Sequence, residues 1–174
     1  MGQLTAIQLL AGKLLENRDI LVFARNIATA IVDGPKSHCA ATLSALLVFA
    51  GIYPNGGGTG DGDLEPRVVT LAFDLENRRG WRRIELASPS HPAERIGSGD
   101  VGVVIVSETE HHIYLVVEAS DQSEPLIADN QLSGVHRRPL AGDTAQEFSP
   151  TTYLLRAPDL GSEFRARTFV ADPI

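Results

Sequence analysis

The sequence of residues 37–51 is SHCAATLSALLVFAG, and it holds the only cysteine of the chain, Cys39. Its apolar residues recur at i, i+3, i+4 and i+7, the spacing of one helix face: Leu43, Leu46, Leu47 and Ala50. Ser37 can cap the start of this helix, and Gly51 can end it. The pattern therefore predicts a helix that begins beside the cysteine and packs one face on a core.

Cys39 falls in the first turn of this predicted helix. Unpaired N–H groups and the helix dipole stabilise an anion there, so we expect a thiol pKa below the ordinary value of about 8.5. A lone cysteine on a helix rich in alanine and leucine is also typical of a packed, inert core residue. This stretch alone favours a nucleophile and a structural cysteine equally.

Composition limits what the rest of the chain can do. The 174 residues are 43% hydrophobic and carry a formal charge of −7, which indicates one globular domain spanning residues 1–174. The negative charge argues against general binding of nucleic acid or of an anionic membrane surface. No apolar run reaches the roughly 20 residues of a membrane span, and residues 1–5 show no signal peptide.

The first half of the chain is predicted to be helical. Helical spacing marks residues 5–16, 20–31 and 66–77, and Pro66 suits the first turn of the last of these. The apolar face of the first helix is predicted to comprise Ile7, Leu10, Ala11, Leu14 and Leu15. That of the second is predicted to comprise Phe23, Ala24, Ile27 and Ile31. The glycine-rich residues 54–65 lack the features of a phosphate loop or an EF-hand, which favours a simple loop.

After residue 80 the apolar period changes from helical to extended. Alternating or β-branched runs predict strands at residues 81–86, 101–107, 112–118, 126–129, 135–139, 152–156 and 164–170. The region around Pro89 and Pro92 is predicted to be a loop. Helices followed by strands are typical of an α+β fold, here with N-terminal helices packed on an antiparallel β-sheet.

A catalytic thiol needs a base close to its sulfur, and histidine is the usual one. His38 adjoins the cysteine but projects in another direction, and the settings of His91 and His136 favour solvated surface positions. The pair His111 and His112 remains, at the start of a predicted strand.

Strand alternation places these two histidines on opposite faces. His112 shares its face with Tyr114 and Val116, whereas His111 shares the other with Ile113 and Leu115. Which face meets the cysteine helix is left open.

The next predicted strand ends in Asp129 and Asn130, either of which can accept a proton of the imidazole and fix its tautomer. An Asp-Asn-Gln run also begins many turns, so this run taken alone favours a purely structural role. The order of cysteine on a helix, histidine on a strand and a polar residue on the following strand is more informative than any one of them.

Four blocks of the sequence together resemble a known family. They are residues 39–54 (the cysteine helix to Ile-Tyr-Pro), 80–83 (Gly-Trp-Arg-Arg), 99–104 (Gly-Asp-Val-Gly-Val-Val) and 112–117 (His-Ile-Tyr-Leu-Val-Val). In this order they resemble the NlpC-type papain-like cysteine peptidases and their relatives, the cysteine, histidine-dependent amidohydrolase/peptidases. The resemblance covers residues 35–135. Many relatives have Asp-Cys-Ser-Gly at the nucleophile, where this chain has His38-Cys39-Ala40-Ala41.

The resemblance implies a papain-like fold and hydrolysis of an amide bond. Cys39 would be the nucleophile, His112 the base, and Asp129 or Asn130 the residue that orients the base. No metal or organic cofactor would be needed. Peptides or peptidoglycan fragments, in particular bacterial cell-wall stem peptides, would be the substrate, and the protein would be exported or face the cell wall. The alternatives are an amidase for another substrate and a non-catalytic binding or structural module on the same fold.

Overall fold

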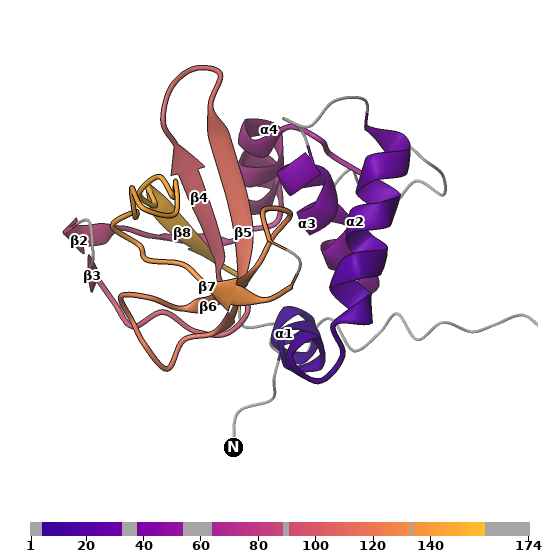
Figure 1. The fold of residues 1–174 in the computed structure, drawn as a ribbon, viewed down its shortest axis with the longest axis horizontal. Helices are drawn as coiled ribbons and strands as arrows, with labels where there is room; N and C mark the ends of the chain where they lie inside the picture. Colours follow the sequence, from indigo (N-terminus) through magenta and orange to yellow (C-terminus); the bar gives the residue numbers. More distant parts are fainter. Residues whose placement is uncertain (1–4, 33–37, 54–63, 89–90, 133, 159–174) are drawn as a thin grey trace, which may run out of the picture.

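A computed structural model describes residues 5–32, 38–53, 64–88, 91–132 and 134–158. Figure 1 shows the helices gathered on one side of the strands. The helices are α1 (Ala6–Glu16), α2 (Asp19–Ile31), α3 (His38–Phe49), α4 (Val68–Phe73) and a short π-helix, η3 (Asp74–Arg78), that continues α4. Three predictions lie outside the described residues: the helix cap at Ser37, most of the loop at 54–65 and the strand at 164–170.

α1 begins and packs as its sequence predicts. The side chain of Thr5 accepts a hydrogen bond from the backbone N–H of Gln8, and the Gln8 side chain accepts one from the backbone of Thr5. This reciprocal capping satisfies two of the N–H groups that a helix start leaves unpaired. The predicted face is buried except for Leu15, which lies at the exposed end of the helix.

The predicted apolar face of α2 was right for Ala24 and for Ile27, which packs on the core, and wrong for its two other residues. The buried residues are Leu21, Ala24 and Ala28, whereas Phe23 is 58% exposed and Ile31 is also exposed. Small residues on the buried face allow α2 to lie close against α3, and the large side chains point outward. The ring of Phe23 stacks there on that of Phe49, with centroids 5.7 Å apart.

α3 is buried on more than the one face that its spacing predicts. Every residue from Cys39 to Leu47 is buried, because α2 packs on one side of the helix and β5 on the other. Gly51 has a φ of 76°, a left-handed conformation that favours glycine and ends the helix as predicted. Cys39 is the second residue of α3, so its predicted place in the first turn is confirmed.

The predicted helix at 66–77 starts later and changes its winding. Arg67 precedes the first residue of α4, so Pro66 is not in the first turn, and the last residues form η3. The buried Asp74 lies at this change, where its carboxylate accepts a hydrogen bond from Arg79 at 2.8 Å.

Six strands form one antiparallel sheet. In sheet order they are β1 (Arg82–Ile84), β8 (Tyr153–Arg156), β4 (Val101–Ile105), β5 (His111–Glu118), β6 (Leu126–Ala128) and β7 (His136–Arg137). The predicted strand at 81–86 is divided: its last residue starts β2 (Leu86–Ser88), which pairs with β3 (His91–Pro92) in a separate two-stranded sheet. The predicted loop around Pro92 was therefore partly wrong.

The two faces of the six-stranded sheet have different coverings. Ile113 and Leu115 pack with the helices in one apolar cluster, whereas Tyr114 and Val116 belong to a second cluster that contains no helix residue. The predicted alternation of β5 is thus confirmed. The structure is an α+β fold with helices packed on an antiparallel sheet, as the sequence predicts.

Candidate active site

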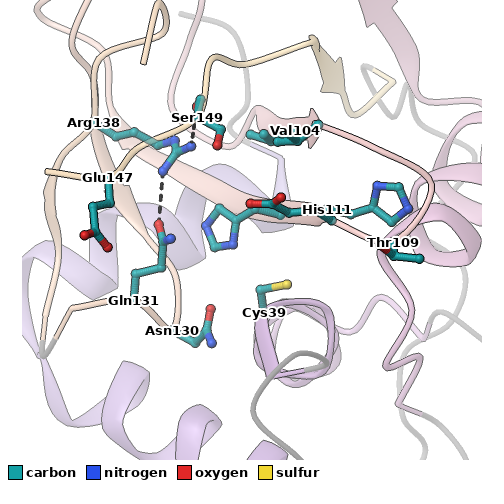
Figure 2. Close-up of a pocket in the computed structure, with 12 residues that line it drawn as sticks. Cys39, Val104, Thr109, His111, Asn130, Gln131, Arg138, Glu147 and Ser149 are labelled. Atoms are coloured by element: carbon teal, nitrogen blue, oxygen red, sulfur yellow. Dashed lines mark hydrogen bonds between the residues drawn. The ribbon is translucent and has the colours of Figure 1, made fainter. Parts of the chain in front are cut away.

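A cavity of about 610 Å³ opens where α3 begins and β5 starts (Figure 2). Its walls include Cys39, both candidate histidines and Asn130, with further residues from the loops after β6 and β7. Val104 in its lining belongs to the helix-free face of the sheet, whereas Cys39 belongs to the helix-covered face. The cavity therefore reaches around the end of the sheet and is accessible to side chains from both faces.

Cys39 is a free, buried cysteine. Its residue is 4% exposed, and burial raises its thiol pKa. The backbone N–H groups of Ile113 and Ala40 favour the thiolate but do not outweigh burial, and the charge of Asp129 adds to the increase. The predicted decrease in pKa was wrong, because a helix start lowers a thiol pKa only where desolvation does not dominate.

His112 is bonded to Asp129. Its Nε2 donates a hydrogen bond to Oδ2 of Asp129 over 2.8 Å, and the Asp129 side chain is fully buried. The other oxygen, Oδ1, accepts the backbone N–H of Gln131 at 2.8 Å. Because a carboxylate only accepts, this bond fixes the proton on Nε2 and leaves Nδ1 of a neutral ring as a base.

The environment keeps Asp129 charged. Burial raises the pKa of this carboxyl, but the hydrogen bond from His112, the charges of His112 and His136 and the Gln131 N–H together leave it below its ordinary value. A buried carboxylate held by partners on several sides is a fixed negative charge behind the imidazole.

His136 was wrongly predicted to lie on the solvated surface. Its side chain is 10% exposed, stacks on Phe148 and has Nε2 at 3.8 Å from Oδ2 of Asp129. Nδ1 hydrogen-bonds the carbonyl of Gly134 at 3.1 Å, whereas the 3.8 Å between Nε2 and the carboxylate is too long for a hydrogen bond. The β6–β7 register could have indicated this position, since it sets His136 opposite Ile127, two residues before Asp129.

His111 and Asn130 line the same cavity without joining the His112–Asp129 pair. Nε2 of His111 bonds the carbonyl of Glu108 at 3.1 Å, and Figure 2 shows the ring on the Thr109 side of the cavity. Asn130 lies on the opposite side of Cys39, with a buried Oδ1 that has no partner among the described residues. Of the two predicted orienting residues, Asp129 contacts His112.

Arg138 is the residue that the sequence analysis missed. It is 1% exposed and lies with its guanidinium carbon 5.2 Å from the ring centre of Tyr114 and 4.8 Å from that of Phe148. Figure 2 shows its hydrogen bonds to Gln131 and Ser149 at the cavity wall. The adjacent arginines 137 and 138 look alike in the sequence, and only the path of the loop after β7 buries the second.

Neither a metal site nor a membrane helix is found in the described part of the chain. No group of three or more His, Cys, Asp or Glu side chains gathers there in a way that could hold a metal ion. None of the described helices is long and apolar enough to cross a bilayer.

Comparisons with known proteins give no match: no family model, no curated protein and no solved structure matches this chain. The chemistry of the cavity is therefore argued from its own residues.

Proposed function

We propose that this protein is a cysteine amidohydrolase of papain-like architecture, with Cys39 as nucleophile, His112 as general base and Asp129 as the residue that orients it. One observation carries the proposal: the His112–Asp129 hydrogen bond lies at a cavity that Cys39 also lines. A thiol, an imidazole with one nitrogen free and a buried carboxylate behind it are the three parts that acyl transfer by cysteine requires.

The reaction begins from a neutral thiol. Nδ1 of His112 takes the proton of Cys39 as Sγ attacks the carbonyl carbon of the amide, forming a tetrahedral intermediate. The imidazolium then gives this proton to the leaving amine as the C–N bond breaks, and a thioester remains. Water, deprotonated by the same imidazole, hydrolyses the thioester and regenerates the thiol. Asp129 stays ionised throughout and stabilises the imidazolium.

The start of α3 supplies charge stabilisation. The backbone N–H of Cys39 lies in the first turn, where N–H groups have no partner within the helix, and it would contribute to the oxyanion site. The Ala40 and Ile113 N–H groups that favour the thiolate add to the same positive field.

The mechanism requires one movement. Within the described residues no hydrogen bond joins Sγ of Cys39 to a histidine ring, so His112 and Cys39 must approach when substrate is bound. Catalytic hydrogen bonds are commonly long before substrate binds and tighten in the complex. By alternation His112 lies on the helix-free side of β5 and Cys39 on the helix-covered side, but both line the same cavity, so a substrate bound there can contact both side chains.

The substrate class follows from the family resemblance. Cell-wall stem peptides are the amides that NlpC-type enzymes are expected to cleave, and the order of cysteine helix, histidine strand and orienting strand supports this class. We therefore propose stem-peptide fragments as the first substrates to assay.

Hydrolysis of soluble muropeptides by the wild-type protein tests the proposal. Cys39→Ala is expected to abolish cleavage with the fold intact, and His112→Ala to reduce it by about 100-fold or more. His111→Ala is the matched control, because this ring bonds the Glu108 carbonyl, and it is expected to keep most activity. Substantial cleavage by Cys39→Ala, or a larger loss in His111→Ala than in His112→Ala, overturns the assignment.

The burial of Cys39 supports a second candidate, a binding module whose cysteine only packs. A raised pKa is the property expected of an inert core thiol. The two candidates differ in the effect of His112: alkylation of Cys39 by iodoacetamide at neutral pH slows in His112→Ala if the imidazole activates the thiol. An unchanged rate, together with no cleavage of any muropeptide, favours the binding module.

A further inference from the structure

The buried guanidinium of Arg138 at the wall of the cavity has a chemistry that the proposed hydrolysis does not use. Among the described residues no carboxylate lies within ion-pair distance of it. The carboxylate whose charge acts on it, that of Asp129, is already held by other side chains. Figure 2 shows the carboxylate of Glu147 directed away from the guanidinium. A buried cation without a counter-ion is costly, and proteins generally provide it with a partner.

The donors of Arg138 are only partly used. Nη1 donates to Oε1 of Gln131 at 3.0 Å and Nη2 to the carbonyl of Ser149 at 2.7 Å. Nε is buried and has no acceptor in the described part of the chain. The rings of Tyr114 and Phe148 lie against the guanidinium, and the Tyr114 hydroxyl also interacts with it, so a planar, doubly accepting group finds a free donor in Nε and a second donor where it replaces Gln131.

Gln131 marks where such a group would enter. Its side chain is exposed and lines the cavity, and its neutral amide oxygen occupies the position of an acceptor for Nη1. An exposed glutamine loses little when it swings away, whereas a carboxylate at this place gains a charge-assisted bond to Arg138.

We propose that Arg138 binds a carboxylate of the ligand, which displaces Gln131 from Nη1. If the cavity hydrolyses amides as proposed above, its substrates carry a carboxylate group on the side of the scissile bond that faces Arg138. This specificity rests on the proposed function only for the position of the amide; the carboxylate site is a property of the cavity itself.

A binding experiment tests the site without any catalysis. The full chain, labelled with ¹⁵N, is titrated with glutarate and separately with glutaramide, its uncharged analogue, while the arginine Nε–H signals are followed. We expect the Arg138 signal to shift saturably with glutarate and to remain in place with glutaramide. The Arg156 signal is the internal control, because its guanidinium is already paired with Asp100. Equal shifts with both compounds, or none with glutarate, overturn the proposal, as does tighter binding of inorganic phosphate than of glutarate.

Two substitutions make the test independent of whether an Arg138 variant folds. Gln131→Glu keeps the shape of the side chain and offers Arg138 an internal carboxylate, so we expect glutarate to bind about tenfold more weakly or worse. Arg137→Gln is the matched control, because this neighbouring arginine is exposed and donates only to the Glu124 carbonyl, and it should leave binding unchanged. Undiminished binding in Gln131→Glu, or an equal loss in Arg137→Gln, contradicts the assignment.

The same titration and an assay of amide hydrolysis, both on the wild-type protein, distinguish this proposal from the proposed function. Glutarate binding without hydrolysis of any amide supports the carboxylate site and contradicts the proposed enzymatic activity. Hydrolysis of neutral and carboxylate-bearing amides at equal rates, without glutarate binding, contradicts the carboxylate site but not the proposed function.

Discussion

Two groups of charged side chains lie near opposite ends of β4, and they are completed in different ways. Near its start, Asp100 receives two hydrogen bonds from Arg156, at 2.8 and 2.7 Å, and a third from the backbone N–H of Gly97 at 2.7 Å. Glu94 completes this group by contacting Arg156 at 3.5 Å and Arg82. We call these four side chains the closed ion cluster, because each charge has a partner of opposite sign within it.

The second group, the pocket cluster of His112, Asp129, His136 and Arg138, lies beyond the other end of β4. His112 stands opposite Val104, near the last residue of that strand. Here one carboxylate lies near two imidazoles. Among the described residues, Nε2 of His136 has no hydrogen-bond partner and Arg138 has no carboxylate within ion-pair distance.

The difference separates structural charges from functional ones. Charged groups that only stabilise a fold are expected to pair with one another, because a buried charge without a partner costs free energy. A site that binds or reacts keeps part of its hydrogen-bonding capacity for a ligand, and perturbed pKa values gather there. The comparison predicts that substitutions in the closed ion cluster affect stability alone, whereas those in the pocket cluster affect stability and chemistry together.

The largest expected loss of stability follows from opening the closed ion cluster. Asp100→Ala removes the carboxylate that anchors Arg156 and Gly97, so we expect the free energy of unfolding to fall by about 3 kcal/mol. Denaturant unfolding measures this. Glu94→Ala is the control at the exposed edge of the same cluster and is expected to lower the free energy of unfolding far less, because solvent screens its ion pairs. Equal losses in the two variants would show that burial does not determine the strength of this cluster.

Asp129→Ala is expected to have the next largest effect on stability, about 2 kcal/mol, because it removes the acceptor of His112 and of the Gln131 N–H. Unlike Asp100→Ala, it should also lower hydrolysis and shift the histidine limb of the activity profile to lower pH, since the imidazolium loses its counter-charge. Rates of muropeptide cleavage against pH measure both effects. Asn130→Ala is the comparison, and a collapse of its rate beside a normal rate for Asp129→Ala transfers the role to Asn130.

The same carboxylate predicts a pH dependence of stability. The pKa of Asp129 is lower in the folded chain than in the unfolded one, so its contribution is present above the ordinary carboxyl range of about pH 4 and is lost as the pH falls through the folded value. We therefore expect wild type and Asp129→Asn to differ most in unfolding free energy at neutral pH and to converge in acid. A difference that grows on acidification contradicts the lowered pKa.

The sequence predicted much of this architecture from periodicity and little of its electrostatics. The spacing around Leu43 predicted α3, and the β-branched run from Val101 predicted β4, because the spacing of apolar residues along the chain indicates directly whether a segment is helical or extended. The outward position of Phe23 was missed, since spacing does not show that Ala24 and Ala28 bring two helices close together.

The sequence likewise predicted some features of the candidate site and not others. Alternation along β6 put Asp129 and Asn130 on opposite faces, which limited the possible partners of His112 to one of them. The burial of Cys39, His136 and Arg138 depends on how distant segments pack and has no local signature. The catalytic roles of Cys39 and His112, and the papain-like identity of the fold, stay predictions until the assays above are made.

The smallest expected effect concerns Tyr114, whose ring lies beneath Arg138 and against Gly102. Its hydroxyl and Oγ1 of Thr151 form a buried hydrogen bond of 2.8 Å, so Tyr114→Phe leaves the threonine unpaired and is expected to cost about 1 kcal/mol. Adding Thr151→Val removes the unpaired partner, so the double variant should be no less stable than Tyr114→Phe alone.

Burial raises the pKa of Tyr114 to about 12. The contribution of its neutral hydroxyl is therefore complete below the ordinary tyrosine value of about 10 and is lost as the pH rises from there through the folded value. Alkaline unfolding should then be less steep in Tyr114→Phe than in wild type. Because phenylalanine keeps the ring under the guanidinium, glutarate binding should be unchanged, and a loss of binding would mean that the hydroxyl, too, belongs to the pocket cluster.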